Sequence, residues 1–227
     1  MKVVSTNVGQ PREFHFQGQT IRSSMHREPV LTGIDVHLSH VEGDKFDNDK
    51  VHGIPEVAVY ALSSDFYRDF ARKIDREVAP GIFGENLTMD KLDESGFMLG
   101  DEYEVGTCRL KVTAPRTPCT KLNFSFQSPE AQKAFADFAR PGVYFEVLTS
   151  GRIQPGDELK LAKANGASYS IADAFELWRL SREISTGRIQ IDDVREQFRR
   201  FVDDERVPSF LRTRFRKIAE APSSHKS

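Results

Sequence analysis

The spacing of apolar residues changes once along this chain, and this change limits the folds that the chain can adopt. Up to about residue 163, apolar side chains alternate with polar ones in short runs separated by glycine and proline turns. A hairpin is predicted around Gly106, with Tyr103 and Val105 before the turn and Leu110 and Val112 after it. Many strands with few helices predict an α+β fold that is mainly β and centred on a barrel, with helices at its periphery.

A second pattern begins after residues 164–168, which read as a linker. Ser170 and Asp173 have the spacing of a capping box, and the apolar period beyond them is 3.6 residues. Three amphipathic helices are predicted from the stripes Ile171, Phe175 and Trp178; Ile191, Val194, Phe198 and Phe201; and Leu211, Phe215 and Ile218. We therefore expect a barrel domain over 1–163, a three-helix domain over 170–219 and a flexible tail over 220–227. Proteases are expected to cut first near residues 165–166 or in the tail, because few buried contacts are predicted at both places.

The composition excludes several classes of protein. Of the 227 residues, 38% are hydrophobic and 29% are charged, which is typical of a soluble globular protein. The net charge of −2 gives no support to a general electrostatic role on membranes or nucleic acids. No apolar run approaches the roughly 18 residues of a spanning helix, and the N-terminus lacks the apolar stretch of a signal peptide. The two cysteines are too few for a disulfide scaffold, so we expect a cytoplasmic protein with free thiols rather than a Cys108–Cys119 disulfide.

One basic stretch in the helical region raises the question of nucleic acid binding. Residues 206–217 contain no acid and five basic residues, Arg206, Arg212, Arg214, Arg216 and Lys217. Over residues 164–227, however, twelve basic residues face ten acidic ones, which is not the signature of a nucleic-acid-binding domain. We interpret the stretch as a solvated helix face and expect no nucleic-acid partner.

A cysteine on a proline-stiffened loop is the strongest candidate for chemistry. Pro115 and Pro118 stop strand pairing after an alternating apolar run and restrict the backbone. Cys119 follows three residues after Arg116 and two before Lys121. Nearby cations favour the thiolate, which is the form that attacks electrophiles and binds soft metals. The alternative is that Cys119 is a small buried hydrophobic residue.

Three other polar motifs stand out in the strand-rich region. Residues 84–87 (GENL) predict a glycine turn that can present an amide to a ligand, and residues 50–53 (KVHG) place a histidine beside a flexible glycine. Residues 42–45 (EGDK) are the third. Each motif is weak by itself, since a lone histidine beside glycine is usually a hydrogen-bonded structural residue and such a glycine tetrapeptide is usually a turn.

The order of these motifs is more specific than any one of them. It resembles the MOSC domain family, named for the C-terminal part of molybdenum-cofactor sulfurases, and in particular its YiiM-like bacterial branch. The resemblance covers about residues 20–162, and the helical region is similar to the small all-helical domain that follows in that branch. The motifs that carry it are EGD at 42–44, KVHG at 50–53, Tyr60, FGENL at 83–87, LGD at 99–101, RTPCTKL at 116–122 and PGD at 155–157.

The resemblance implies a distorted closed β-barrel like that of pyruvate kinase, and a molybdenum–pterin cofactor held by a cysteine. Carried over to this sequence, Cys119 is the metal thiolate and the catalytic residue. Arg116 and Lys121 are then candidates to neutralise the cofactor phosphate or the oxo-metal charge, while Asn86 and His52 are candidates for hydrogen bonds to the pterin or the substrate. The chemistry agrees, because thiolate suits a soft metal centre and a forked arginine binds phosphate with two hydrogen bonds.

The family implies an oxidoreductase that reduces N-hydroxylated small molecules such as hydroxylamino-purines. No flavin or nicotinamide fingerprint is visible in the sequence, so a separate electron-transfer protein is an expected partner. The alternative is a module that binds or carries the cofactor or sulfur without turnover. The sequence departs from the family pattern HGGPDRAV at Ile54 and Val57, which replace the second glycine and the arginine, and this slightly favours the alternative.

Overall fold

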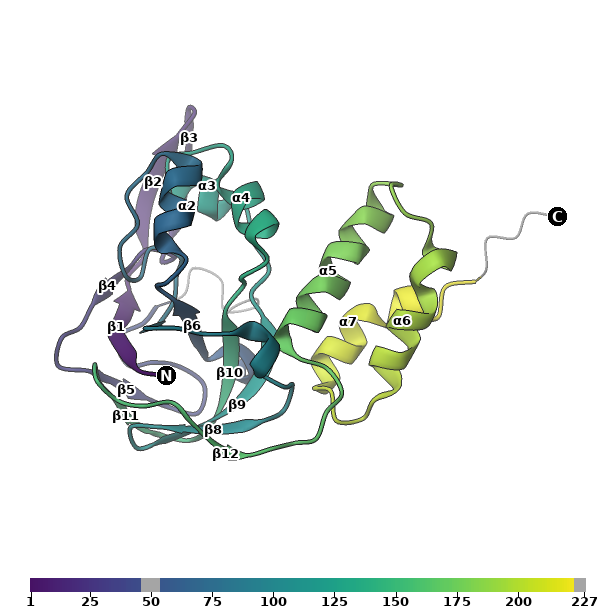
Figure 1. The fold of residues 1–227 in the computed structure, drawn as a ribbon. Coiled ribbons are helices and arrows are strands. Elements are labelled where there is room, and N and C mark those ends of the chain that lie inside the picture. Colours follow the sequence, from purple (N-terminus) through teal and green to yellow (C-terminus); the bar gives the residue numbers. More distant parts are fainter. Residues whose placement is uncertain (46–53, 223–227) are drawn as a thin grey trace.

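A computed structural model describes residues 1–45 and 54–222 and shows three C-terminal helices beside a region that contains the strands and the other helices (Figure 1). The strands are β1 (Val3–Gly9), β2 (Arg12–Phe16), β3 (Gln19–Ser23), β4 (Arg27–Pro29), β5 (Ile34–Val36), β6 (Val59–Ser63), β7 (Leu87–Met89), β8 (Glu102–Val105), β9 (Cys108–Pro115), β10 (Val143–Thr149), β11 (Gly151–Ile153) and β12 (Lys160–Lys163). The α-helices are α2 (Tyr67–Ile74), α3 (Lys121–Ser125), α4 (Ala131–Phe138), α5 (Ile171–Ser185), α6 (Ile191–Asp203) and α7 (Ser209–Ala219), with 3-10 turns η1 (Pro55–Val57) and η2 (Glu94–Gly96). The α+β class is confirmed.

Eight strands form one mixed sheet in the order β12-β8-β9-β10-β6-β7-β1-β4. Neighbouring strands are antiparallel except β6 and β7, which are parallel. In β9 the alternation seen in the sequence places Leu110 and Val112 fully inside, with Arg109 and Lys111 less buried between them. The predicted hairpin around Gly106 is present as β8 and β9, which pair Val105 with Cys108.

The sheet is strongly curled, but within residues 1–45 and 54–222 it does not close as the predicted barrel. Its end strands β12 and β4 do not pair with each other. Instead, the chain before β12 meets the start of β1 through an isolated bridge between Lys2 and Glu158 and a bond from Val3 N to Asp157 O of 2.9 Å. The three-residue β4 ends in Pro29, which cannot donate a ladder hydrogen bond, so closure by edge pairing stops there.

A second layer of helices covers one end of the sheet. Helices α2, α3 and α4 lie together there (Figure 1), and their inner faces share one aromatic cluster. The cluster centres on Phe66, Phe70, Phe83 and Phe135, whose rings lie 4.9–6.4 Å apart. The spacing of Phe66, Phe70 and Ile74 in the sequence predicts a helix after residues 63–64, and the packing of α2 in this cluster confirms it. A second helix is predicted with Ser128 as its N-cap and Pro129 at its first position. The observed α4 begins at Ala131 instead, because residues 129–130 form a turn before it.

The three C-terminal helices stand to one side of the sheet (Figure 1), and the segment that joins them to it is held by hydrogen bonds. The predicted capping box at Ser170 is present, and Ser170 also bridges Met98. Asn165 donates from its side chain to Leu99 O at 3.1 Å and to Arg206 O at 2.9 Å, while Arg206 donates to Gly166 O. Partners distant in sequence therefore tie this linker down, while residues 164–166 and 168 stay exposed, and early cleavage there stays a prediction.

Helices α5, α6 and α7 share the main hydrophobic core with the sheet. Ile171 of α5, Phe198 and Phe201 of α6 and Phe215 of α7 are each at most 2% exposed. The three helices thus occupy the positions that the sequence predicts, while the independent folding of residues 170–219 stays a prediction. In the described part of the chain, no helix has the length and apolar character needed to cross a membrane.

Candidate functional site

A cavity of about 330 Å³ opens where β9 leaves the sheet. Its wall combines residues from the segment after β3, the loop after β9, the neighbouring strands and α7. They are Ser23, Ser24, Met25, Arg27, Ile54, Val57, Tyr60, Phe83, Gly84, Asn86, Ala114, Pro115, Arg116, Thr117, Cys119, Lys121, Tyr144, Phe210 and Arg214. Four of these are cationic and none of the described lining residues is Asp or Glu. The cavity therefore favours an anionic ligand.

The loop that carries Cys119 is fixed at both ends. On one side Pro115 still pairs with Val143 in the sheet. On the other side Leu122 of α3 is fully buried, which contributes about 2 kcal/mol of burial free energy. Leu122 N also donates to Cys119 O at 3.1 Å, so the thiol is presented by a loop with little freedom. Cys119 is partly exposed and lines the cavity, so the alternative that it is a buried hydrophobic residue is not supported.

Arg116 is a buried cation that no carboxylate contacts among the residues that the structure describes. It is 5% exposed, and its guanidinium carbon lies 5.0 Å from the ring centre of Phe135 and 5.7 Å from that of Tyr60. Its Nη2 contacts Met25 Sδ at 3.8 Å, and its buried Nη1 has no hydrogen-bond partner among the residues that the structure describes. A buried donor without a partner is costly, which indicates that a ligand completes this site.

Arg116 is electrostatically coupled to the rest of the cavity wall. Burial acts to lower the pKa of Arg116, but Tyr60, Cys119 and Tyr144 outweigh it, and the pKa is raised. Burial raises the pKa of Tyr144, against the opposing effect of the Arg116 and Arg27 cations. The Tyr144 hydroxyl therefore stays protonated at neutral pH and can donate a hydrogen bond.

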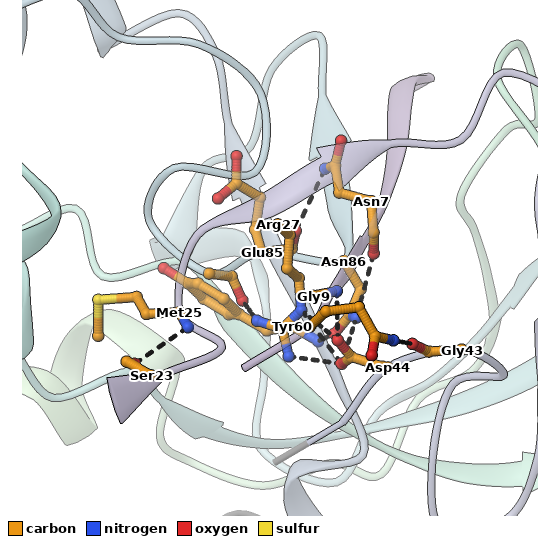
Figure 2. A network of polar contacts seen from close by, with 12 residues as sticks. Asn7, Gly9, Ser23, Met25, Arg27, Gly43, Asp44, Tyr60, Glu85 and Asn86 are labelled. Carbon is orange, nitrogen blue, oxygen red and sulfur yellow. Dashed lines mark hydrogen bonds and ion pairs between the residues drawn. The ribbon is translucent and has the colours of Figure 1, made fainter. Parts of the chain in front are cut away.

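A buried network around Asp44 supports the floor of the cavity (Figure 2). Asp44 accepts from Arg27 Nη2 at 2.6 Å, from Gly9 N at 2.7 Å and from Asn86 Nδ2 at 3.1 Å. Arg27 also donates from Nη1 to Gly84 O. The charge of Arg27 is thus matched by a carboxylate, which leaves Arg116 as the deep cation available to a ligand.

The Asn86 side chain is engaged by protein partners. Besides its bond to Asp44, it donates to Asn7 O at 3.4 Å and accepts from Tyr60 N at 3.1 Å. Its neighbour Glu85 is fully buried and accepts from Tyr67, from Gly81 N at 2.7 Å and from Phe83 N at 3.1 Å. Burial raises the pKa of Glu85. The FGENL motif therefore shapes the cavity wall, and a direct bond from Asn86 to a ligand stays a prediction.

The two cysteines occupy different environments. Cys108 is 2% exposed, and burial raises its pKa to about 11, so it does not form a thiolate near neutral pH. Both cysteines are free thiols in the structure, as the sequence predicts. Within residues 1–45 and 54–222, no three His, Cys, Asp or Glu side chains gather as a metal cage. A metal at Cys119 would therefore need ligands other than such a cage.

Four of the five predicted site residues meet at this cavity. Arg116, Cys119, Lys121 and Asn86 all line it, whereas His52 lies outside the described residues. Sequence reasoning missed three further groups of lining residues: Arg27 with Met25, Tyr144, and Phe210 with Arg214. Only the last pair had a local signal, because the stretch 206–217 carries five cations and no acid.

Comparisons with known proteins bear on the family and the fold of this chain. Residues 48–160 match the model of the MOSC domain. YiiM of Escherichia coli is 33% identical over 125 residues, which are 53% of this chain and 55% of that protein. A protein of Gibberella moniliformis named Reductase is 32% identical over 172 residues, which are 74% of this chain but 30% of that protein. The crystal structure of YiiM from Geobacillus stearothermophilus matches with a TM-score of 0.75 and 27% identity, covering 96% of this chain and 98% of that one.

Proposed function

Because this chain is a YiiM-like member of the MOSC domain family, we propose that it binds the molybdenum cofactor and reduces N-hydroxylated small molecules. One observation carries the proposal. Arg116, a buried cation whose Nη1 has no partner in the described part of the chain, lies in the same cavity wall as the partly exposed Cys119, and no described acid lines that wall. An anionic ligand that also accepts a thiolate satisfies both residues at once.

The residues present fit the cofactor. Cys119 would supply the protein thiolate to the metal, while Arg116 and Lys121 would neutralise the phosphate or the oxo groups. The orphaned Nη1 of Arg116 is the direct argument, because a phosphate or oxo oxygen would satisfy it. His52 and Asn86 remain candidates for polar contacts to the pterin or the substrate.

The cofactor would supply the two-electron redox chemistry that no protein side chain provides. The overall reaction takes a hydroxylamine, two electrons and two protons to the amine and water. Within this reaction, the chain's own residues would bind and orient the cofactor and the substrate. Arg116 attracts the anionic group, the rings of Tyr60 and Phe83 exclude water from the wall, and the protonated Tyr144 hydroxyl can donate to the substrate oxygen.

The two electrons would come from a separate electron-transfer protein in a reducing cytoplasm. The name of the Gibberella moniliformis relative, Reductase, supports the direction of the reaction. This chain spans 30% of that relative, so the remainder of that protein has no counterpart here.

A second function, carriage of the cofactor or of sulfur without turnover, is favoured by one observation. Ile54 and Val57, which replace a glycine and an arginine of the family pattern, both line the cavity. An apolar side chain at 57 removes a cation from the wall, and this would weaken the hold on a reacting anion.

Metal analysis and a reduction assay together test the proposal. Protein from a host that makes the cofactor should contain molybdenum, and with a chemical reductant it should convert 6-hydroxylaminopurine to adenine. Bound molybdenum without conversion would favour the carrier function, since a chemical reductant replaces the missing partner. Absence of molybdenum would refute both functions that involve the cofactor.

A further inference from the structure

Helix α7 contributes two residues to the cavity that the loop and the strands leave open. Phe210 and Arg214 are four positions apart, so they project from the same face of the helix. Both line the cavity that contains Arg116 and Cys119. An aromatic ring and a cation side by side are the pair that binds a planar base and its phosphate, through stacking and a forked hydrogen bond.

The position of α7 is set by packing, which makes this rim a preformed feature. On the adjacent face, Leu211 and Phe215 are 2% exposed and Ala219 is 1% exposed in the main core. The turn before α7 is tied to the linker by the bonds that Asn165 and Arg206 make across it. Phe210 and Arg214 are therefore held at the cavity by a helix that is anchored elsewhere.

Arg214 differs from the other arginines of α7 in having no partner in the described part of the chain. Arg212 donates to Val207 O at 3.1 Å, and Arg216 lies 4.0 Å from Glu220, whereas no hydrogen bond or ion pair is formed by Arg214 within residues 1–45 and 54–222. Arg214 is exposed where it lines the cavity, and partial burial lowers its pKa. A cation at a cavity with no anion beside it among the described residues is suited to an anionic ligand.

We propose that Phe210 and Arg214 form a substrate subsite that recognises a purine nucleotide, with Phe210 stacking on the base and Arg214 binding the 5′-phosphate. The inference rests on the proposed function, in which Arg116 and Cys119 hold the cofactor, and it extends that function from free bases to nucleotides. Two separate cations then bind two separate anionic groups. Arg116 binds the cofactor in the cavity wall, and Arg214 binds the phosphate of the substrate at the rim.

Calorimetric titration of the full-length protein, purified from a host that makes the molybdenum cofactor, tests this subsite. Adenosine 5′-monophosphate and adenosine serve as probes, because neither has an N–O bond to reduce. Wild type should bind the monophosphate about tenfold or more tightly than adenosine. Arg214→Gln should abolish this preference without weakening adenosine, and Phe210→Ala should weaken both probes about tenfold. Arg216→Gln is the matched control, because it removes a cation from the same helix away from the cavity, and it should behave as wild type.

Three results would overturn the subsite. They are equal binding of the two probes by wild type, no measurable binding of either, and an unchanged preference in Arg214→Gln. Molybdenum is measured on the same preparations, and loss of metal in Arg214→Gln would also overturn the subsite by assigning the residue to the cofactor. Absence of molybdenum from wild type would refute the proposed function alone, since the nucleotide titration does not require the metal.

Discussion

Replacing Arg116 by methionine should separate ligand binding from stability. Arg116 is 5% exposed, and within the described residues it makes no carboxylate contact and its Nη1 has no partner. Methionine has a similar length and no polar group, so Arg116→Met removes the charge and leaves the packing between Phe135, Tyr60 and Met25 largely filled.

In the protein without cofactor, the expected change in the free energy of unfolding is the sum of two opposing contributions. Burying a polar group without a partner costs about 1–3 kcal/mol, and methionine removes that cost. The two ring contacts contribute about 0.5–2 kcal/mol each, and they are lost. At the middle of these ranges about 2.5 kcal/mol is lost and about 2 kcal/mol is gained, so the free energy of unfolding should change by about 1 kcal/mol or less. With cofactor, a charged hydrogen-bond partner is lost, which costs about 2 kcal/mol or more and weakens retention about 30-fold.

Urea unfolding of the cofactor-free protein and cofactor titration into it measure the two quantities. Arg116→Lys should restore retention only in part, because a point charge cannot form the two-pronged contact. Arg140→Met is the matched control, since Arg140 also lies over a ring, 5.4 Å from Phe66, but does not line the cavity. Wild-type affinity in Arg116→Met would refute the reasoning, and so would a loss of stability of about 3 kcal/mol, which would make Arg116 a structural residue.

Three further predictions concern other parts of the molecule. Cys119→Ser should abolish molybdenum retention while Cys108→Ser keeps it, because of the two cysteines only Cys119 lines the cavity. Metal analysis measures this, and equal metal content in wild type and Cys119→Ser would contradict the assignment of Cys119 as the metal ligand. Asp44→Asn should lower the free energy of unfolding by about 3 kcal/mol in urea, because it leaves Arg27 buried without its anion, and a change below about 1 kcal/mol would show that the network is not structural. Hydrogen bonds from Arg206 hold the pKa of Asp204 below its ordinary value of 3.8, so the folded state binds fewer protons there than the unfolded state. The contribution of Asp204 to the free energy of unfolding should be complete above pH 3.8 and lost as the pH falls through the lower folded-state pKa. The difference in stability between wild type and Asp204→Asn should therefore shrink over that pH window. A difference that stays constant would refute this role of Asp204.

The local elements were largely predictable from the sequence, because their causes lie within a few residues. The alternation in β9, the capping box at Ser170 and the spacing of Phe66 and Phe70 each act over one or two turns or one strand. The loop at Cys119 was predictable for the same reason, since its flanking prolines restrict the backbone wherever they occur.

The composition of the cavity could be predicted only in part. The order of the motifs led to Arg116, Cys119, Lys121 and Asn86, all of which line the cavity. That order did not reveal that the Asn86 amide is engaged by protein partners, because its bond to Asp44 joins residues 42 positions apart.

Taken alone, the sequence determined most of the strands and helices, the proline-flanked loop that carries Cys119 and the family that the chain resembles, since propensity and pattern act locally. Only the tertiary structure decided that the sheet stays open between its end strands, that Arg27 is neutralised while Arg116 is not, and that α7 reaches the cavity. Arg27 meets Asp44 across 17 residues and Gly84 across 57, and Arg116 meets Met25 across 91. These contacts form because the curled sheet and the shared core bring together segments that are distant in sequence, and no local sequence pattern encodes such contacts.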